Sequence, residues 1–150
     1  MEEEFVSESP EDTIAIGKKI ARQLSPPDVV ALIGELGTGK TLLAQAIAKT
    51  LGVKDYVTSP SFKLISEYQA CPPKRGRFPV YHIDLFRLNT PQVQDLGLEE
   101  YLFGKGVSII EWAEKMRAWL PENCWLIELS YLGKTLRKIK IKKPDHEGTK

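Results

Sequence analysis

Apolar residues near the start of the chain follow a helical period. They recur at every fourth position, at Ile16, Ile20 and Leu24. This is the spacing of one buried helical face. Ser9 is a favoured N-cap and Pro10 a favoured first residue. A helix is therefore predicted over residues 10–24.

Three mostly apolar runs cover residues 28–33, 79–83 and 107–110, and the first of them shows no polar alternation. Such runs are typical of strands that are buried on both faces, as in a parallel sheet covered by helices. Residues 62–68 alternate in part and predict a further strand. Residues 125–132 and 136–142 predict two more strands, which we expect to pair across a turn at Gly133.

Further helical patterns lie between these strands. They cover residues 42–51 up to Gly52, a short stretch that opens at Thr90 and continues or restarts over 98–103, and residues 113–120 before Pro121. Helices that alternate with apolar strands indicate an α/β fold. The predicted fold is a mixed β-sheet flanked by helices, with a C-terminal antiparallel hairpin.

The length of 150 residues fits a single domain. We expect one domain over residues 1–150, with flexible ends at about 1–6 and 144–150. Apolar residues make up 42% and charged residues 27% of the chain. These values are close to those of soluble globular domains and argue against disorder or a coiled coil.

The charges of basic and acidic side chains nearly cancel, since the chain has 21 Lys and Arg and 20 Asp and Glu. This balance lacks the broad basic surface of a protein that binds nucleic acid unaided. We therefore expect no DNA binding, and RNA only through a partner. Lysines alternate along the last predicted strand, at Lys138, Lys140 and Lys142. We interpret them as protection of a sheet edge against aggregation.

The chain lacks the sequence signs of export. An acidic run opens it, where a secretory signal would be basic and then apolar. The apolar runs are much shorter than the roughly 20 residues that cross a bilayer. Cys71 and Cys124 form no C-x-x-C pair, so neither a disulfide framework nor a zinc site is favoured. A cytoplasmic location without a membrane is predicted.

Residues 34–41 match the phosphate-binding P-loop pattern G-x-x-x-x-G-K-[ST] in full. The glycines let successive N–H groups point inward, and the following helix adds its positive end. Lys40 is expected to reach the β- and γ-phosphates, and Thr41 to bind Mg²⁺. The amides expected to hold phosphate oxygens belong to Gly37, Thr38, Gly39, Lys40, Thr41 and Leu42.

A triphosphate with Mg²⁺ also needs a carboxylate nearby. Asp84 and Glu111 each follow one of the apolar runs. Ligands of open α/β sheets lie at the carboxyl ends of parallel strands, so both acids are expected to face the P-loop, as catalytic or metal-binding residues. Their position does not rank the two roles. His82 fits either a ligand or a structural residue.

A hydroxyl-rich loop follows the P-loop helix, with Thr58, Ser59 and Ser61 around Pro60. Nucleotide switches often keep a hydroxyl that senses the γ-phosphate in such a loop. An ordinary polar loop has the same composition, and both interpretations stay open.

Four segments together resemble a known family. They are the P-loop, residues 58–62 with the sequence TSPSF, residues 82–88 with the sequence HIDLFRL, and the pair Glu111-Trp112. In this order, and over almost the whole chain, they resemble the bacterial P-loop ATPases of the TsaE family, also called YjeE.

This resemblance implies a function in forming N6-threonylcarbamoyladenosine at position 37 of tRNAs that read codons starting with A. Proteins of the family bind ATP and Mg²⁺ and hydrolyse ATP together with the transferase TsaD and its partner TsaB. Hydrolysis is thought to reset the complex between rounds of modification.

The resemblance also implies roles for single residues. Asp84 looks like the Walker-B type carboxylate, and Glu111 like a metal-binding or water-positioning acid. Thr13 and Arg137 look like contacts to the adenine or sugar. The chain departs from the family at Phe86, where a tyrosine is frequent, and at Ala113, where a proline is frequent. Neither departure removes a charge or a phosphate donor.

Two other functions fit the P-loop. A small-molecule kinase would use the same loop, but it needs an acceptor pocket and usually a lid with arginines. Arginine is sparse here, and Arg75 and Arg77 are the only close pair. A nucleotide-gated binding module would keep the loop without useful turnover.

Overall fold

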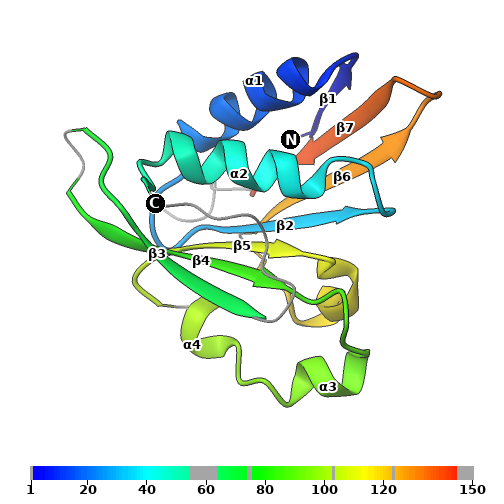
Figure 1. Cartoon of the computed structure of the whole chain (residues 1–150). Coiled ribbons are helices and arrows are strands. Elements are labelled where there is room, and N and C mark those ends of the chain that lie inside the picture. The colour runs from blue at the N-terminus through cyan, green and yellow to red at the C-terminus, as the bar shows by residue number, and fades with distance from the viewer. Residues whose placement is uncertain (1, 55–63, 74–75, 103, 123, 145–150) are drawn as a thin grey trace.

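The strands form one mixed seven-stranded sheet in the computed structural model, which describes residues 2–54, 64–73, 76–102, 104–122 and 124–144 (Figure 1). The order across the sheet is β1-β7-β6-β2-β5-β4-β3. The strands are β1 (Glu2–Ser7), β2 (Val29–Gly34), β3 (Ile65–Ala70), β4 (Phe78–Asp84), β5 (Val107–Glu111), β6 (Trp125–Tyr131) and β7 (Arg137–Lys142). The predicted α/β fold with its C-terminal antiparallel pair is confirmed.

The centre of the sheet is parallel. Strand β2 lies between β5 and β6 and runs parallel to both, and β4 runs parallel to β5. These strands contain the apolar runs of the sequence, and Val30, Val80 and Ile109 are fully buried. Because these strands are parallel, their last residues lie at the same end of the sheet. These residues are Gly34 of β2, Asp84 of β4 and Glu111 of β5.

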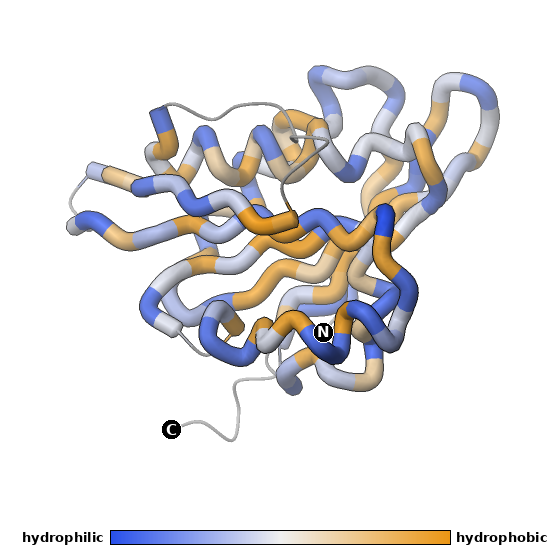
Figure 2. Tube along the Cα trace, turned by 60° about the horizontal axis from the view of Figure 1, so that its bottom comes forward, coloured by the Kyte–Doolittle hydropathy of each residue, from blue (hydrophilic) through white to orange (hydrophobic). Residues whose placement is uncertain are grey.

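Helices cover both faces of the sheet (Figure 1). Helix α1 (Pro10–Ala21) and helix α2 (Lys40–Thr50) pack together on one face. The other face carries α3 (Thr90–Gln94), α4 (Glu99–Leu102) and the 3₁₀ segment η1 (Ala113–Trp119). Figure 2 shows the hydrophobic residues along the central strands, between these layers. Within the described ranges, no helix is long and apolar enough to cross a membrane.

Two predicted helices differ from the observed ones. Helix α1 ends at Ala21 instead of residue 24, but Leu24 remains fully buried in the turn that follows. The segment after Glu111 is a 3₁₀ helix with non-helical backbone angles at Met116. Met116 is 2% exposed, so burial of its side chain outweighs the regular helical period there.

The expectation of a flexible end over residues 1–6 is wrong, because Glu2–Ser7 form β1 along β7. Glu2 pairs with Lys140 at 3.6 Å and Glu3 with Lys143 at 3.2 Å. The interpretation of β7 as a sheet edge is therefore also wrong. The acidic start and the lysine-rich strand are complementary, and β1 takes the edge. Residues 145–150 lie outside the described residues.

Candidate nucleotide-binding site

The P-loop joins β2 to α2, as the motif requires. Gly37 (φ 83°) and Gly39 (φ 105°) adopt left-handed backbone angles that glycine tolerates best. The Thr38 hydroxyl donates to the Glu35 carbonyl at 2.7 Å and closes the turn over residues 35–38. Helix α2 begins at Lys40, so its N-terminal amides lie where an anion would bind.

Lys40 points back onto its own loop. The side chain is 5% exposed, and Nζ donates to the carbonyl of Gly34 and, at 3.1 Å, to that of Glu35. Burial lowers the Lys40 pKa, and the charges of Glu114, Glu111 and Asp84 partly offset this. A phosphate could replace the carbonyls as acceptor for the ammonium group.

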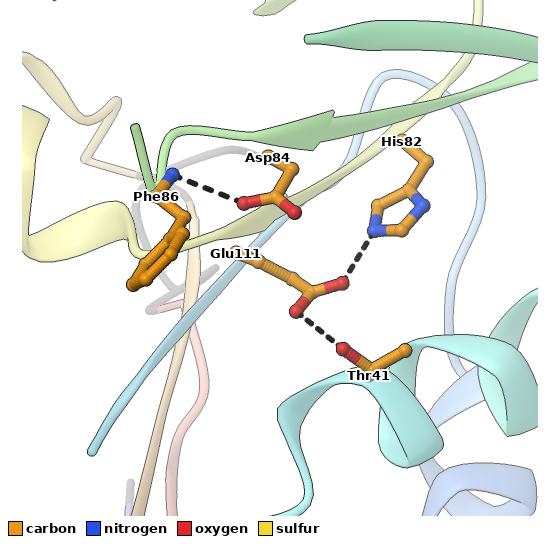
Figure 3. Close-up of polar contacts among 5 residues, drawn as sticks. All are labelled: Thr41, His82, Asp84, Phe86 and Glu111. Carbon is orange, nitrogen blue, oxygen red and sulfur yellow. Dashed lines mark hydrogen bonds and ion pairs between the residues drawn. The ribbon is translucent and has the colours of Figure 1, made fainter. Parts of the chain in front are cut away.

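Glu111 is the centre of a buried polar chain (Figure 3). Its Oε1 accepts from the Thr41 hydroxyl at 2.8 Å, and its Oε2 lies 2.6 Å from His82 Nε2. Glu111 is 2% and His82 3% exposed. Thr41 and Glu111, which the sequence analysis expected at one phosphate and metal site, are thus in direct contact. The structure places His82 beside them, where the sequence left its role open.

Asp84 lies at the neighbouring strand end, in register with Glu111. It is half-buried, and its Oδ1 accepts from the Phe86 amide at 3.0 Å (Figure 3). Its negative charge acts on Lys40. Both predicted acids therefore lie at the P-loop edge, in different surroundings.

Trp112 is a site residue that the sequence analysis did not select. The Lys40 Nζ lies 3.6 Å from the centroid of its ring, and the Phe86 ring lies 5.1 Å away. Trp112 has φ 61° and ψ 39°, a left-handed backbone that is uncommon outside glycine. Its position directly after Glu111 was the signal available in the sequence.

A pocket of about 210 Å³ opens beside the P-loop. It is lined by several of the predicted nucleotide-binding residues, namely Thr13, Gly37, Thr38, Gly39, Leu42 and Arg137. The Thr13 hydroxyl lies 2.7 Å from that of Ser7, at the end of β1. A second pocket, also about 210 Å³, is lined in part by Lys40, Thr41, Glu111 and Trp112. The candidates therefore line two pockets that share Gly37, Gly39 and Leu42.

Two further predictions concern the hydroxyl-rich loop after α2 and the metal site. Thr58, Ser59 and Ser61 lie outside the described residues. Among the residues that the structure describes, no group of three or more His, Cys, Asp or Glu side chains is placed to hold a metal ion.

Comparison with known proteins identifies the family. A model described as "Threonylcarbamoyl adenosine biosynthesis protein TsaE" matches residues 7–139. The chain belongs to the TsaE family. It is 39% identical over 131 residues to the tRNA threonylcarbamoyladenosine biosynthesis protein TsaE of Bacillus subtilis, covering 87% of this chain and 79% of that relative.

Another member of the family and a solved structure are similar over most of their length. The TsaE protein of Treponema pallidum is 36% identical over 137 residues, which cover 91% of this chain and 97% of the relative. The crystal structure of Bacillus subtilis YdiB superposes with a TM-score of 0.77 and 33% identity, covering 97% of this chain and 88% of YdiB. The resemblance inferred from the four sequence segments is confirmed.

Proposed function

We propose that this TsaE family member binds ATP with Mg²⁺ and hydrolyses it during formation of threonylcarbamoyladenosine in tRNA. One observation carries the proposal. The complete P-loop sits between a buried strand and a helix, and its Thr41 hydroxyl is bonded to the buried carboxylate of Glu111. Groups that bind the phosphates, and a residue that holds Mg²⁺ or orients the attacking water, are recurring parts of phosphoryl transfer to water.

The two pockets divide the nucleotide between them. The amides from Gly37 to Leu42 and the Lys40 ammonium would hold the phosphates, because they combine a helix N-terminus with a positive charge. Thr13 and Arg137 would contact the adenine or the sugar in the pocket on the β1 side. Adenine as the base follows from the family.

The residues at the strand ends fit Mg²⁺. Magnesium prefers oxygen ligands and is usually bound through one or two carboxylates together with substrate phosphates. Thr41, Glu111 and Asp84 offer such oxygens beside the loop that would hold the phosphates. When bound, Mg²⁺ would neutralise charge on the β- and γ-phosphates.

The chain's own residues would do the remaining work. Lys40 would balance charge on the transferred phosphoryl group. Glu111, whose Oε2 is held by His82, would orient the attacking water and accept its proton. Because Glu111 is buried, its hydrogen bonds act in a low dielectric, where they are stronger than in water.

The partners follow from the family and belong to the same proposal. TsaD and TsaB would form the complex in which hydrolysis takes place, and tRNA would reach this chain through that complex. Hydrolysis would reset the transferase between rounds and would not supply the threonylcarbamoyl group. We propose that this takes place in the cytoplasm.

An ATPase assay with and without TsaD and TsaB tests the proposal. We expect turnover to rise when both partners are added. A panel of small-molecule acceptors belongs in the same assay. Acceptor-dependent ADP release by the isolated chain would instead indicate a kinase.

Lys40→Ala tests the phosphate site by calorimetry with ADP. The change removes a charge-assisted hydrogen bond worth about 1.5–3 kcal/mol, so affinity should fall at least about tenfold. Lys49→Ala is the matched control, since Lys49 is exposed in the last turn of the same helix. Equal affinities of the wild type and the Lys40 variant would contradict the phosphate site.

A further inference from the structure

The outer arm of the P-loop, Leu36 and Gly37, is tied to the β6–β7 hairpin. The Tyr131 hydroxyl, at the end of β6, donates to the Leu36 carbonyl at 2.8 Å. The two residues are 95 positions apart in the sequence. Leu36 is 71% exposed, so contacts with the core do little to hold this arm.

The rest of the P-loop, residues 34, 35 and 38–40, is held by other hydrogen bonds. Thr38 and Lys40 both bond to the carbonyl of Glu35, and Lys40 also bonds to that of Gly34. These bonds are made within the loop itself and do not involve Leu36 or Gly37. Tyr131 instead bonds to Leu36, next to Gly37, whose amide is one of the expected phosphate donors.

Gly37 gives independent support for this contact. It occupies a variable position of the P-loop pattern, so the motif itself does not require glycine there. A Cβ atom at this position would lie 2.6 Å from the Tyr131 hydroxyl oxygen, closer than the two atoms can approach. Glycine therefore leaves room for the tyrosine, in addition to permitting the φ of 83°.

The ring of Tyr131 is in turn held by Arg137. The two residues face each other across the hairpin, and the guanidinium carbon lies 4.4 Å from the ring centroid. Arg137 also lines the pocket beside Gly37. One continuous set of contacts thus leads from the pocket proposed for the nucleoside to the phosphate loop.

We infer that Tyr131 is a positioning residue for the P-loop, and that Arg137 couples it to nucleoside recognition. The inference rests on the proposed nucleotide site. A loop that is already ordered binds its ligand more tightly, because less conformational entropy is lost on binding. Tyr131 need not touch the nucleotide to act in this way.

Tyr131→Phe tests the inference, since it removes the hydroxyl and keeps the ring for Arg137. NMR order parameters of the Leu36 and Gly37 amides should fall in the free protein, and ADP affinity should weaken about three- to tenfold, the usual effect of one hydrogen bond. Tyr101→Phe is the matched control, because it deletes a hydroxyl on α4, on the other face of the sheet. It should change neither quantity.

Each result decides between roles. Unchanged order parameters with weaker ADP binding would mean that the hydroxyl contacts the nucleotide directly, and would overturn the inference. Lower order parameters with unchanged ADP affinity would overturn it as well. Failure of the wild type to bind ADP would refute the proposed function instead.

Arg137→Leu tests the coupling through the ring. Without the guanidinium, the Tyr131 ring loses its contact with Arg137 but keeps its hydroxyl bond to Leu36. The Gly37 order parameter should therefore fall by less than in Tyr131→Phe. No change at Gly37 would remove Arg137 from the inference. Thermal unfolding of every variant serves as the check that a local effect is not a general loss of stability.

Discussion

The ends of β4 and β5 each carry a carboxylate at the same edge of the sheet, in different surroundings. Glu111 is 2% exposed and is bonded to Thr41 and His82. Asp84 is half-buried, and one of its oxygens accepts from the amide of Phe86, two residues on. The first acid is held by side chains from two other elements, whereas the contact described for the second lies within its own turn.

This difference indicates a division of labour. A buried carboxylate with both oxygens engaged has a defined orientation before any ligand binds, which favours positioning a reacting water. A half-buried carboxylate acts mainly through its charge, and can adjust to a cation and its waters. We therefore propose that Glu111 orients the water and that Asp84 balances charge around Mg²⁺, and both proposals can be tested.

Glu111→Gln should have the largest effect. The amide keeps nearly the same shape but cannot accept a proton from water. We expect partner-stimulated ATP turnover to fall about 100-fold or more, the range typical of a lost general base, with ADP binding retained in calorimetry. Turnover within a few fold of wild type would break the comparison, since Glu111 would then have no chemical role.

His82→Ala should have the next largest effect, although His82 is proposed only to position Glu111. Loss of such a partner typically lowers activity about 10- to 100-fold. His82→Gln offers another N–H donor and should recover part of the loss. Equal turnover in both variants, whether high or low, would argue against a role through the hydrogen bond.

Asp84→Asn should affect the metal requirement more than the maximal rate. The amide oxygen can still accept from the Phe86 N–H, so the turn is expected to persist. We expect the Mg²⁺ concentration for half-maximal turnover to rise about tenfold, as for the loss of one charged contact. A drop in the rate at saturating Mg²⁺ as large as that of Glu111→Gln would remove the distinction between the two acids.

Phe86→Tyr should have the smallest effect. Phe86 is 48% exposed, so an added hydroxyl can point into solvent. Unfolding free energy should change by less than about 0.5 kcal/mol, as is usual for surface substitutions. The measurement is chemical denaturation. A larger increase in the unfolding free energy would show that the hydroxyl of the tyrosine, which is frequent in this family, forms a hydrogen bond near Asp84.

Local patterns were enough to predict most of the fold. The mostly apolar runs predicted β2, β4 and β5, because strands buried on both faces need few polar positions. The P-loop was predictable from its own motif, and the two acids because each directly follows such a run. The start of the chain was not predictable in this way, because Glu2 and Glu3 are paired with lysines about 140 residues away.

Contacts between distant segments account for the other gaps in the predicted site. The bond between His82 and Glu111 depends on the alignment of β4 with β5, which no local pattern gives. The left-handed backbone at Trp112, which brings its ring over Lys40, also has no signal in the residue type. The chemical character of each residue could be predicted from the sequence, but these contacts between distant segments could not.

The pairing of β1 with β7 has a practical consequence for handling this protein. A truncation that begins after Ser7 would delete an edge strand together with Ser7, which lines the pocket proposed for the nucleoside. It would also leave the backbone of β7 open to pairing with other molecules. Shortened versions would then tend to self-associate and lose ligand at the same time, so affinity tags belong at the opposite end.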